Sequence, residues 1–552
     1  MAQASREQLR YVVGIGGVSD SALHTVLDAV RALPSLVHEP ISRRRLSKAA
    51  LSIMDKVGDK EKLKLGSRDF EWEFCSPQKL LRYLCKTCPF LLRALREAHE
   101  RTPCSYEVPW HIVLFADELT PGNPLAPDNR RKSWLFNFSF LELGAGKLCH
   151  EEAWIPVAVL RTSICKDIEG HIGNCTRVLL RRFFCGADGF SKVGVVLGEG
   201  DFAFILFAIF SQLLADADGI RAIMDAKGSS GLLPCFKCKN VLYNLASGID
   251  IGVYCVPIGC GKPELFDECD DKDHWDRVDH LLTRKPIVSK GALEKMETSL
   301  GINCNPHGVM ADVELREFAP PSKVVRYETM HCVFQNGIVS VETRNFLEAV
   351  REYRPTVYQD LKLLLEAHWS WPWHRPGIGA RLVQCFSPAR VRANHEANKF
   401  KAGASEVLTL FPIMKFYVDR TLRVIPGLTA ALALQFDSWD KLCIVVDMVR
   451  FMRGRPRTEA EEAAFRVAVG NHVEAFDKAY PDATVKPKHH FMFHTGFLDA
   501  WCCERKNATA KTHFQHIDCT RKFEKSALAR LLNEQVRQLQ SQLLWLTFFR
   551  HR

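Results

Sequence analysis

Three apolar runs between residues 110 and 160 constrain the fold more than any other part of the sequence. The first, residues 110–115 (WHIVLF), has the character of a buried strand and ends shortly before Asp117. Two further runs, residues 134–143 and 154–160, follow a turn-rich segment. Strands joined by short connections favour an antiparallel meander. The sequence therefore predicts a sheet whose first strand carries an aspartate at its end.

A fourth apolar run, residues 203–215, leads directly into Asp216. Periodicity does not decide between a helix and a strand for a continuous apolar run. The stretch is too short to cross a bilayer, and Glu199 and Asp201 precede it. No membrane segment is expected.

Helical periodicity dominates the rest of the chain. Apolar residues recur at helical spacing in 6–34, in 77–101, through most of 340–480 and in 520–546. Residues 240–320 are expected to be irregular, with scattered Cys, Gly, Pro and Asp. The predicted class is mixed α/β, with a β-containing core, a long helical interruption and a helical end.

Composition restricts the compartment more than the chemistry. The 552 residues carry a formal net charge of +10, a mild basic bias that fits a nucleic-acid partner without demanding one. The first 20 residues lack the pattern of a secretory signal, so the 20 cysteines are expected to be reduced thiols in a cytosolic or nuclear protein.

Three acidic residues, Asp117, Asp216 and Glu504, are the candidates for catalysis. Two-metal phosphoryl chemistry needs carboxylates brought together from distant parts of a chain, and Mg²⁺ prefers such oxygen ligands. Each acid also has a structural interpretation. Asp117 can cap a turn, Asp216 can cap a helix over 217–226, and Glu504 can form a surface ion pair. Asp218 is the nearby competitor of Asp216.

Cys235 and Cys238 form a Cys-x-x-Cys pair, which is half of a zinc site. The alternatives are unligated thiols or a redox pair, although no short βαβ unit supports the second. The other half of a zinc site is not evident from spacing. The candidate partners are the following Cys and His residues: Cys255, Cys260, Cys269, His274 and His331.

Two basic segments are candidates for contact with DNA. Lys486, Lys488, His489 and His490 form a dense run, interpreted either as a nucleic-acid groove or as a solvated charge run. Residues 453–456 (RGRP) match a short sequence that can lie in an A·T-rich minor groove, but a loop between two helices explains them equally well.

Four sequence blocks, in their residues and in their order, resemble the motifs of eukaryotic cut-and-paste DDE/D transposases of the CACTA, Plavaka and KDZ-like group. The resemblance covers roughly residues 75–515. The blocks are PWHIVLFADELTPGNPL with RRKSWLFNFSFLELG, LLADADGIRAIMDAKGSSGLLPCFKCKN, RYETMHCVFQNGI, and KPKHHFMFHTGFLDAWCCERKNATAK. The resemblance assigns the catalytic, metal-binding places to Asp117, Asp216 and Glu504. In the third block family members often have Asp-x-x-His, where this chain has Glu328 and His331.

The resemblance implies an RNase H-like core with a large, mainly helical insertion and a helical N-terminal region. The expected division is a helical region at 1–105, the first part of the core at 106–240, an irregular and then helical insertion at 241–480, and the end of the core with a C-terminal helix at 481–552. The implied cofactor is Mg²⁺ or Mn²⁺ at the three acids. Zn²⁺ at Cys235 and Cys238 stays an alternative to unligated thiols, and it rests on their spacing.

The implied function is two-metal cleavage and strand transfer of DNA in the nucleus, with transposon ends as the partner and room for a homo-oligomer. The cations expected to bind DNA are Lys227, Lys486, Lys488, Arg505, Lys506 and Lys511. Two alternatives stay open: a domesticated, catalytically inactive DNA-binding protein, and a zinc-stabilised interaction protein.

Overall fold

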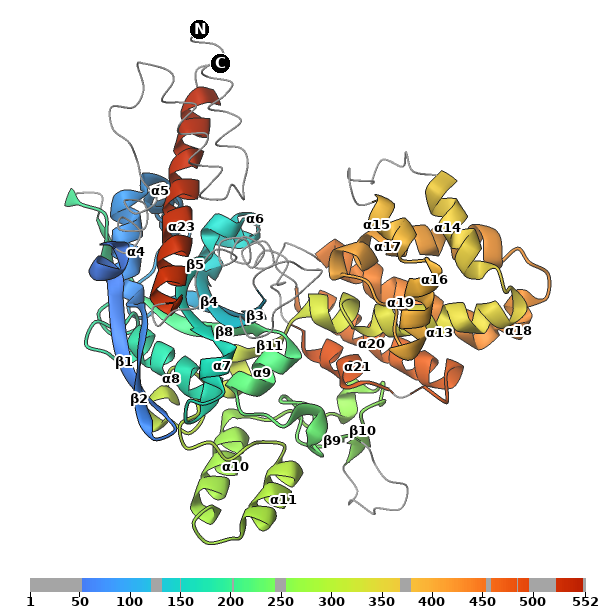
Figure 1. The fold of residues 1–552 in the computed structure, drawn as a ribbon, viewed down its shortest axis with the longest axis horizontal. Helices are drawn as coiled ribbons and strands as arrows, with labels where there is room; N and C mark the ends of the chain where they lie inside the picture. The colour runs from blue at the N-terminus through green and yellow to red at the C-terminus, as the bar shows by residue number, and fades with distance from the viewer. Residues whose placement is uncertain are drawn as a thin grey trace.

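The computed structural model describes residues 52–120, 132–148, 150–200, 203–243, 255–367, 379–452, 458–483, 485–495 and 523–549. A mixed five-stranded sheet lies at the centre of one half of the molecule, and a body of helices lies beside it (Figure 1). The predicted mixed α/β class is confirmed. Glu504, Arg505, Lys506 and Lys511 lie outside the described residues, as do the predicted helix at 6–34 and the RGRP segment at 453–456.

The sheet has the order β11-β8-β3-β4-β5. The meander predicted from the three apolar runs is confirmed: β3 (Trp110–Leu119), β4 (Ser133–Phe140) and β5 (Ile155–Arg161) are antiparallel neighbours. The ambiguous run before Asp216 is a strand, β8 (Ala208–Ala215), and it pairs parallel with β3. The short β11 (Val325–Tyr327) adds parallel to β8 at the edge.

Helices cover the sheet on both faces, which explains why its strands are continuously apolar. Every residue of β4 is buried. On one side Phe138 of β4 packs edge-to-face against Phe183 of α8 (His171–Phe184), with ring centroids 5.1 Å apart. The predicted C-terminal helix is confirmed as α23 (Phe523–Phe549), which contacts β5, β2 and α5.

The N-terminal part of the described chain corrects the prediction that residues 1–105 are helical. Residues 77–101 do form helices, α4 (Pro77–Thr87) and α5 (Pro89–Arg101), but a hairpin of β1 (Gly58–Leu65) and β2 (Arg68–Cys75) precedes them. Charged and apolar side chains alternate in this hairpin, and Lys60 Nζ lies 2.6 Å from Glu71 Oε1 across the strands. This alternation is the period-two signal of a strand.

Residues 240–320 are also more ordered than predicted. They contain short strands β9 (Val241–Leu242) and β10 (Val256–Pro257) and a helical hairpin of α10 (Asp271–Arg284) and α11 (Lys290–Leu300). The α10 helix begins with a capping box between Asp270 and Asp273. The prediction of an irregular segment is therefore wrong for residues 271–300.

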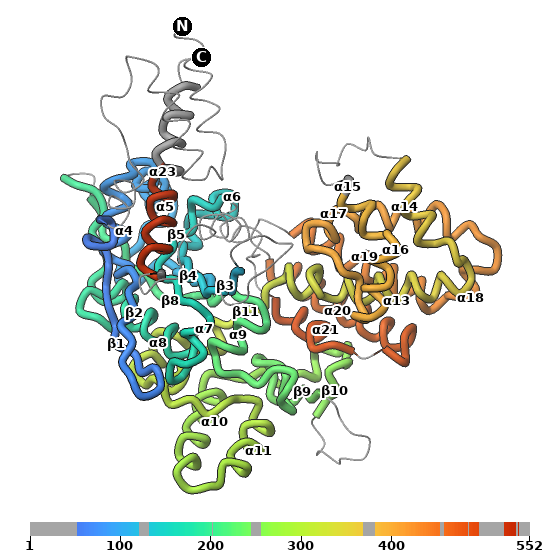
Figure 2. Tube along the Cα trace, viewed as in Figure 1, coloured from blue at the N-terminus to red at the C-terminus, as the bar shows by residue number. Residues whose placement is uncertain are grey.

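The helical body confirms the prediction for residues 340–480. Its longest helices are α13 (Ile338–Tyr353), α19 (Ala433–Met452) and α20 (Glu459–Ala479), and the tube in Figure 2 follows the chain through them. The body begins ten residues after β11 and its chain returns to the same place, because Thr495 forms a parallel bridge with Tyr327 of β11. Departure and return are thus both next to the carboxyl end of the sheet.

Among the described residues, none of the helices combines the length and apolar character needed to cross a membrane.

Candidate functional site

Asp117 and Asp216 lie level with each other on neighbouring parallel strands. The β3–β8 register pairs Phe115 with Leu214, so two residues further along each strand the two aspartates stand side by side. Both line one cavity of about 1070 Å³ at the carboxyl end of these two strands. A rigid sheet thus brings together two of the three carboxylates predicted from the sequence.

Asp216 also has the structural role that its position suggested. It is the N-cap of α9 (Ala217–Ile223), and its Oδ1 accepts a hydrogen bond from the Gly219 backbone N at 2.6 Å. The helix is shorter than the predicted 217–226. The competitor Asp218 is largely exposed and pairs with Arg221 at 3.2 Å. Capping by one oxygen leaves the second oxygen of Asp216 for another ligand.

Glu328 stands in the same row. The β11–β8 register pairs Tyr327 with Ala215, which puts Glu328 level with Asp216. Its buried carboxylate accepts hydrogen bonds from the backbone N of Met330 at 2.6 Å and of His331 at 2.7 Å. It also bonds the His331 Nδ1 at 2.7 Å. Glu328 therefore orients the His331 ring at the carboxyl end of β11.

The pKa of His331 is raised. Burial lowers it, but the hydrogen bond and charge of Glu328 and the charge of Asp216 outweigh burial. This electrostatic coupling shows that the His331 ring belongs to the same neighbourhood as Asp216.

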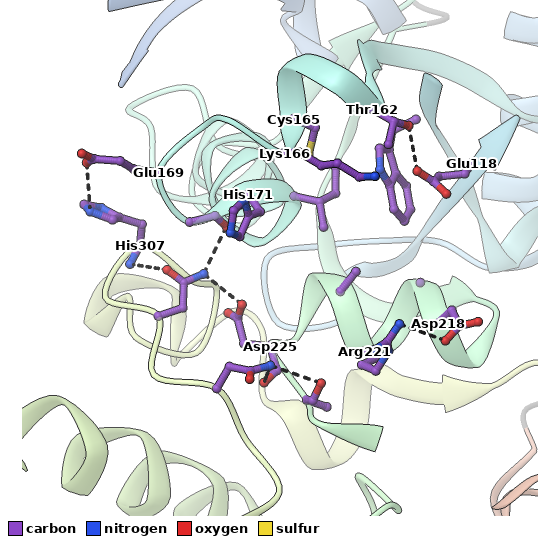
Figure 3. Close-up of a pocket in the computed structure, with 18 of the residues that line it drawn as sticks. Glu118, Thr162, Cys165, Lys166, Glu169, His171, Asp218, Arg221, Asp225 and His307 are labelled. Atoms are coloured by element: carbon purple, nitrogen blue, oxygen red, sulfur yellow. Dashed lines mark hydrogen bonds and ion pairs between the residues drawn. The ribbon is translucent and has the colours of Figure 1, made fainter. Parts of the chain in front are cut away.

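Glu118, which follows Asp117, also lines the cavity. Its carboxylate accepts a hydrogen bond from Thr162 Oγ1 at 2.7 Å (Figure 3). It also pairs with Lys132. Lys166 and Lys285 also line the cavity. Lysines around a pair of aspartates suit an anionic ligand. A divalent ion would neutralise the aspartates, and the lysines would balance the remaining negative charge of the ligand.

The far end of the cavity holds a buried carboxyl group. Burial raises the pKa of Asp225 to about 8, although the Asn305 Nδ2 donates a hydrogen bond to it at 2.9 Å. The carboxylate lies against Gly173 and Gly308, where an added Cβ would come within 3.2 and 2.1 Å of its oxygens. These glycines leave the space that the group occupies.

A second site lies next to the first. Cys235, Cys238, His490 and His494 are all buried, and one ligand atom from each lies within 4.8 Å of the others. Cys238 Sγ is 3.1 Å from His494 Nε2, which is 3.3 Å from His490 Nε2. Two thiolates and two imidazoles at this spacing fit tetrahedral Zn²⁺.

The local fold explains the ligand spacing. The two cysteines lie in the loop after α9. His490 lies in α21 (Pro487–Phe491), and His494 is the last residue of the single 3-10 turn that follows α21. Residues four apart on consecutive helical turns project to the same side. Hydrogen bonding from Cys238 and the nearby His490 and His494 lower the pKa of Cys235 well below its usual range, against the effect of burial.

The predicted metal pair is thus part of a cluster that can hold zinc, but the predicted partners are wrong. Cys269 accepts a hydrogen bond from Arg277 instead, His274 stacks on Phe236, and His331 bonds Glu328. Spacing alone did not find the histidines because His490 ends a basic run and was grouped with it, and His494 follows three apolar residues.

The predicted DNA-binding cations that the structure describes differ in their surroundings. Lys486 and Lys488 line a groove beside α9, but His489 and His490 of the same run are fully buried. Lys227 pairs with Glu297 at 2.9 Å, and both side chains are mostly buried. The run 486–490 is therefore neither a continuous solvated cluster nor a continuous basic face.

No protein-family model matches the sequence, and a search of curated proteins gives no match. The function of the chain is therefore inferred from the geometry of the two sites.

Proposed function

We propose that this protein is a DDE/D transposase-like polynucleotidyl transferase that cleaves and joins DNA at transposon ends in the nucleus. The observation that carries the proposal is the alignment of Asp117 and Asp216 at the ends of adjacent parallel strands, facing one large cavity. Two carboxylates on a rigid support are what a divalent-metal site needs from a protein.

The sheet supports an RNase H-like core. Three consecutive antiparallel strands, with two later strands added parallel beside the first, are the arrangement expected of that fold. The helical body between β11 and residue 495 then corresponds to the implied insertion. The bridge of Thr495 to Tyr327 supports Glu504 as the third acid, because the chain is back beside β11 nine residues before Glu504.

The carboxylates fit Mg²⁺ or Mn²⁺, and Asp117 and Asp216 would hold it with Glu504 as the third acid. Bound divalent cations would activate the attacking oxygen and stabilise the leaving oxygen of a phosphodiester. Glu328 is not the third ligand in this proposal, because it already accepts three N–H bonds. It holds His331 beside Asp216 instead.

The zinc site has a structural role in this proposal. Buried protein side chains would fill all four positions of a tetrahedron around the ion, which is typical of structural rather than catalytic zinc. Zinc would fasten the return of the helical body to the loop after α9. It would thereby support Tyr327, whose hydroxyl accepts a hydrogen bond from the Phe236 backbone N at 2.9 Å.

The test is cleavage of DNA that carries the element's own terminal repeats, with and without Mg²⁺. Asp117→Asn and Glu504→Gln should each lower the cleavage rate by a factor of about a thousand or more, because loss of a metal-holding group removes several kcal/mol of transition-state stabilisation. The matched control is Asp276→Asn, whose exposed carboxylate on α10 lines neither the cavity nor the groove beside α9 and should matter little. Cleavage by Asp117→Asn at the unaltered rate would reject the catalytic assignment.

An unaltered protein that binds terminal-repeat DNA but does not cut it in Mg²⁺ or Mn²⁺ would favour the domesticated DNA-binding alternative. Stoichiometric zinc with neither DNA binding nor cleavage would favour a zinc-stabilised interaction protein.

A further inference from the structure

Four lysines from two distant segments converge beside α9. Lys399 and Lys401 follow α16 (Pro388–Glu396), and Lys486 and Lys488 lie at the start of α21. Burial and the charges of the other three lysines together lower the pKa of Lys399. Over the described ranges of the chain, no carboxylate forms an ion pair with any of the four. Like charges held together without a counter-charge destabilise the fold unless an anion binds.

The lysines are next to the aspartate cavity. Lys399, Lys486 and Lys488 line a groove of about 470 Å³ whose walls include α9 and α21. This groove and the aspartate cavity share the side chains of Asp218 and Arg221. A continuous surface therefore runs from the cavity, across the first turns of α9, into the groove.

The loop that presents Lys399 and Lys401 is fixed by hydrogen bonds. The Oδ1 of the buried Asn394 accepts a hydrogen bond from the Lys401 backbone N at 2.7 Å. Its backbone carbonyl oxygen accepts one from the Lys399 backbone N at 3.2 Å. Between them, the Phe400 backbone N donates to the Ser340 carbonyl oxygen at 2.7 Å. A fixed loop loses little conformational entropy when its side chains bind a ligand.

Lys488 has a different role within the cluster. Its ammonium group donates to the carbonyl oxygens of His331 at 3.0 Å and Gln335 at 3.3 Å, at the turn that follows β11. Its charge adds to the positive potential of the groove, but its position is set by the protein. Lys399, Lys401 and Lys486 are therefore the side chains available to a ligand.

The lining of the groove indicates the class of ligand. Its aromatic residues, Phe236, Tyr327 and Phe491, are all buried, and Tyr327 and Phe491 stack on each other with ring centroids 4.0 Å apart, so they offer no open face for base stacking. Asn336 and Asn398 add neutral polar groups. Lysine ammonium groups bind phosphate as point charges and, at the backbone, read no base sequence.

We infer that Lys399, Lys401 and Lys486 bind the phosphodiester backbone of a nucleic-acid strand that passes from this groove, across α9, into the aspartate cavity. The inference rests on the proposed function, which gives the strand a reason to reach the aspartates. It adds a path for the strand and a sequence-independent mode of binding.

The experiment measures binding of the full-length protein to fluorescein-labelled single-stranded and duplex DNA by anisotropy, without added divalent cations, over a range of salt concentrations. The variant is Lys399→Gln/Lys401→Gln/Lys486→Gln. The matched control, Lys290→Gln/Lys295→Gln/Lys323→Gln, removes the same charge from exposed sites away from the groove. The groove variant should bind at least tenfold more weakly near 0.15 M salt, and its log–log salt slope should fall by about two. The control should change affinity by less than threefold.

Acetylation of the unaltered protein gives a readout that does not depend on the folding of a variant. DNA should protect Lys399, Lys401 and Lys486 from an amine-reactive reagent, and should leave Lys290 and Lys295 reactive. Equal affinity of the groove variant and the control, or no protection, overturns the inference. Tighter binding of a polyglutamate of equal charge than of DNA also overturns it, in favour of an acidic protein partner.

Cleavage assays on the same DNA separate this inference from the proposed function. If the groove variant loses affinity while the unaltered protein never cleaves DNA, the strand path stands and the transferase proposal fails. If the unaltered protein cleaves and the groove variant binds and cleaves equally well, the proposed function stands and the groove assignment fails.

Discussion

Glu342 and His472 form a fully buried pair that joins two helices of the helical body. The Glu342 Oε2 lies 2.5 Å from His472 Nε2, and neither side chain is exposed. The other carboxylate oxygen accepts a hydrogen bond from Ser438 Oγ at 2.6 Å. One carboxylate of α13 is thus bonded to both α19 and α20, and His472 in turn lies against His489, with ring centroids 6.4 Å apart, next to the cluster residue His490.

Removal of this carboxylate should destabilise the protein strongly. Glu342→Ala leaves two buried polar partners without a bond, which costs about 3–5 kcal/mol. Glu342→Gln, which keeps a hydrogen-bonding group in place, should cost less. Urea denaturation followed by circular dichroism measures both. The control is Glu366→Ala, which removes an exposed partner of Lys362 and should cost under about 1 kcal/mol. Equal midpoints for Glu342→Ala and Glu366→Ala would contradict the structural role.

Zinc should be bound by the four-residue cluster and not by the neighbouring thiol. Cys238→Ala and His494→Ala should each lose stoichiometric zinc, because three ligands no longer complete the tetrahedron. Cys269→Ala, a buried thiol outside the cluster, should keep its zinc. Metal analysis of each purified protein by mass spectrometry makes the comparison.

Metal loss should also lower the melting temperature, since metal binding to the folded state contributes to its stability. Treatment of the unaltered protein with a chelator should reproduce the melting temperature of Cys238→Ala. One zinc per chain in Cys238→Ala would show that the cluster is not the site.

The sequence predicted the sheet better than it predicted the sites. Continuous apolar runs gave β3, β4 and β5 because strands covered on both faces have no polar alternation. The side-by-side position of Asp117 and Asp216 depends on which strands pair and in what register. Local sequence spacing encodes neither. The β1–β2 hairpin carried a period-two signal, but its many charges disguised it.

The zinc cluster shows why the rest could not be read from spacing. Its two halves are separated by more than 250 residues, so they meet only after the helical body has folded and returned. His490 follows Lys486, Lys488 and His489 in the sequence, a composition typical of an exposed segment. In the structure, α21 buries His489 and the ligand His490, whereas Lys486 at its start is exposed.

Stability should fall as the pH rises because of Asp225. The folded state holds the Asp225 proton up to a pKa of about 8, while the unfolded chain releases it near the ordinary aspartate pKa of 3.8. Between these values the folded state binds more protons, so the free energy of unfolding decreases with rising pH, by up to about 1.4 kcal/mol per pH unit. The contribution is fully present below the lower value and is lost by about pH 8.

Asp225→Asn should abolish this part of the pH dependence. The amide cannot ionise, it can still accept the Asn305 hydrogen bond, and asparagine tolerates the positive φ of 53° at this position. Denaturation midpoints at pH 5 and pH 8 should differ less for Asp225→Asn than for the unaltered protein, and the variant should be the more stable of the two at pH 8. Asp218→Asn serves as the control, and an unchanged pH dependence in Asp225→Asn would reject the assignment.

Asp216 offers a way to separate structural from catalytic roles at a single position. Its Oδ1 caps α9 through the Gly219 backbone N, and asparagine caps helices about as well as aspartate does. Asp216→Asn should therefore keep the free energy of unfolding within about 0.5 kcal/mol, whereas Asp216→Ala should lose about 1 kcal/mol.

If Asp216 acted only as a cap, the asparagine variant would cleave DNA normally and only the alanine variant would be impaired. If Asp216 holds a divalent cation beside Asp117, both variants lose cleavage in Mg²⁺ equally, because an amide does not replace a carboxylate as a ligand for a hard cation. Parallel urea denaturation and cleavage assays on the two variants decide between these roles, since the cap predicts that activity follows stability and the metal site predicts that it does not.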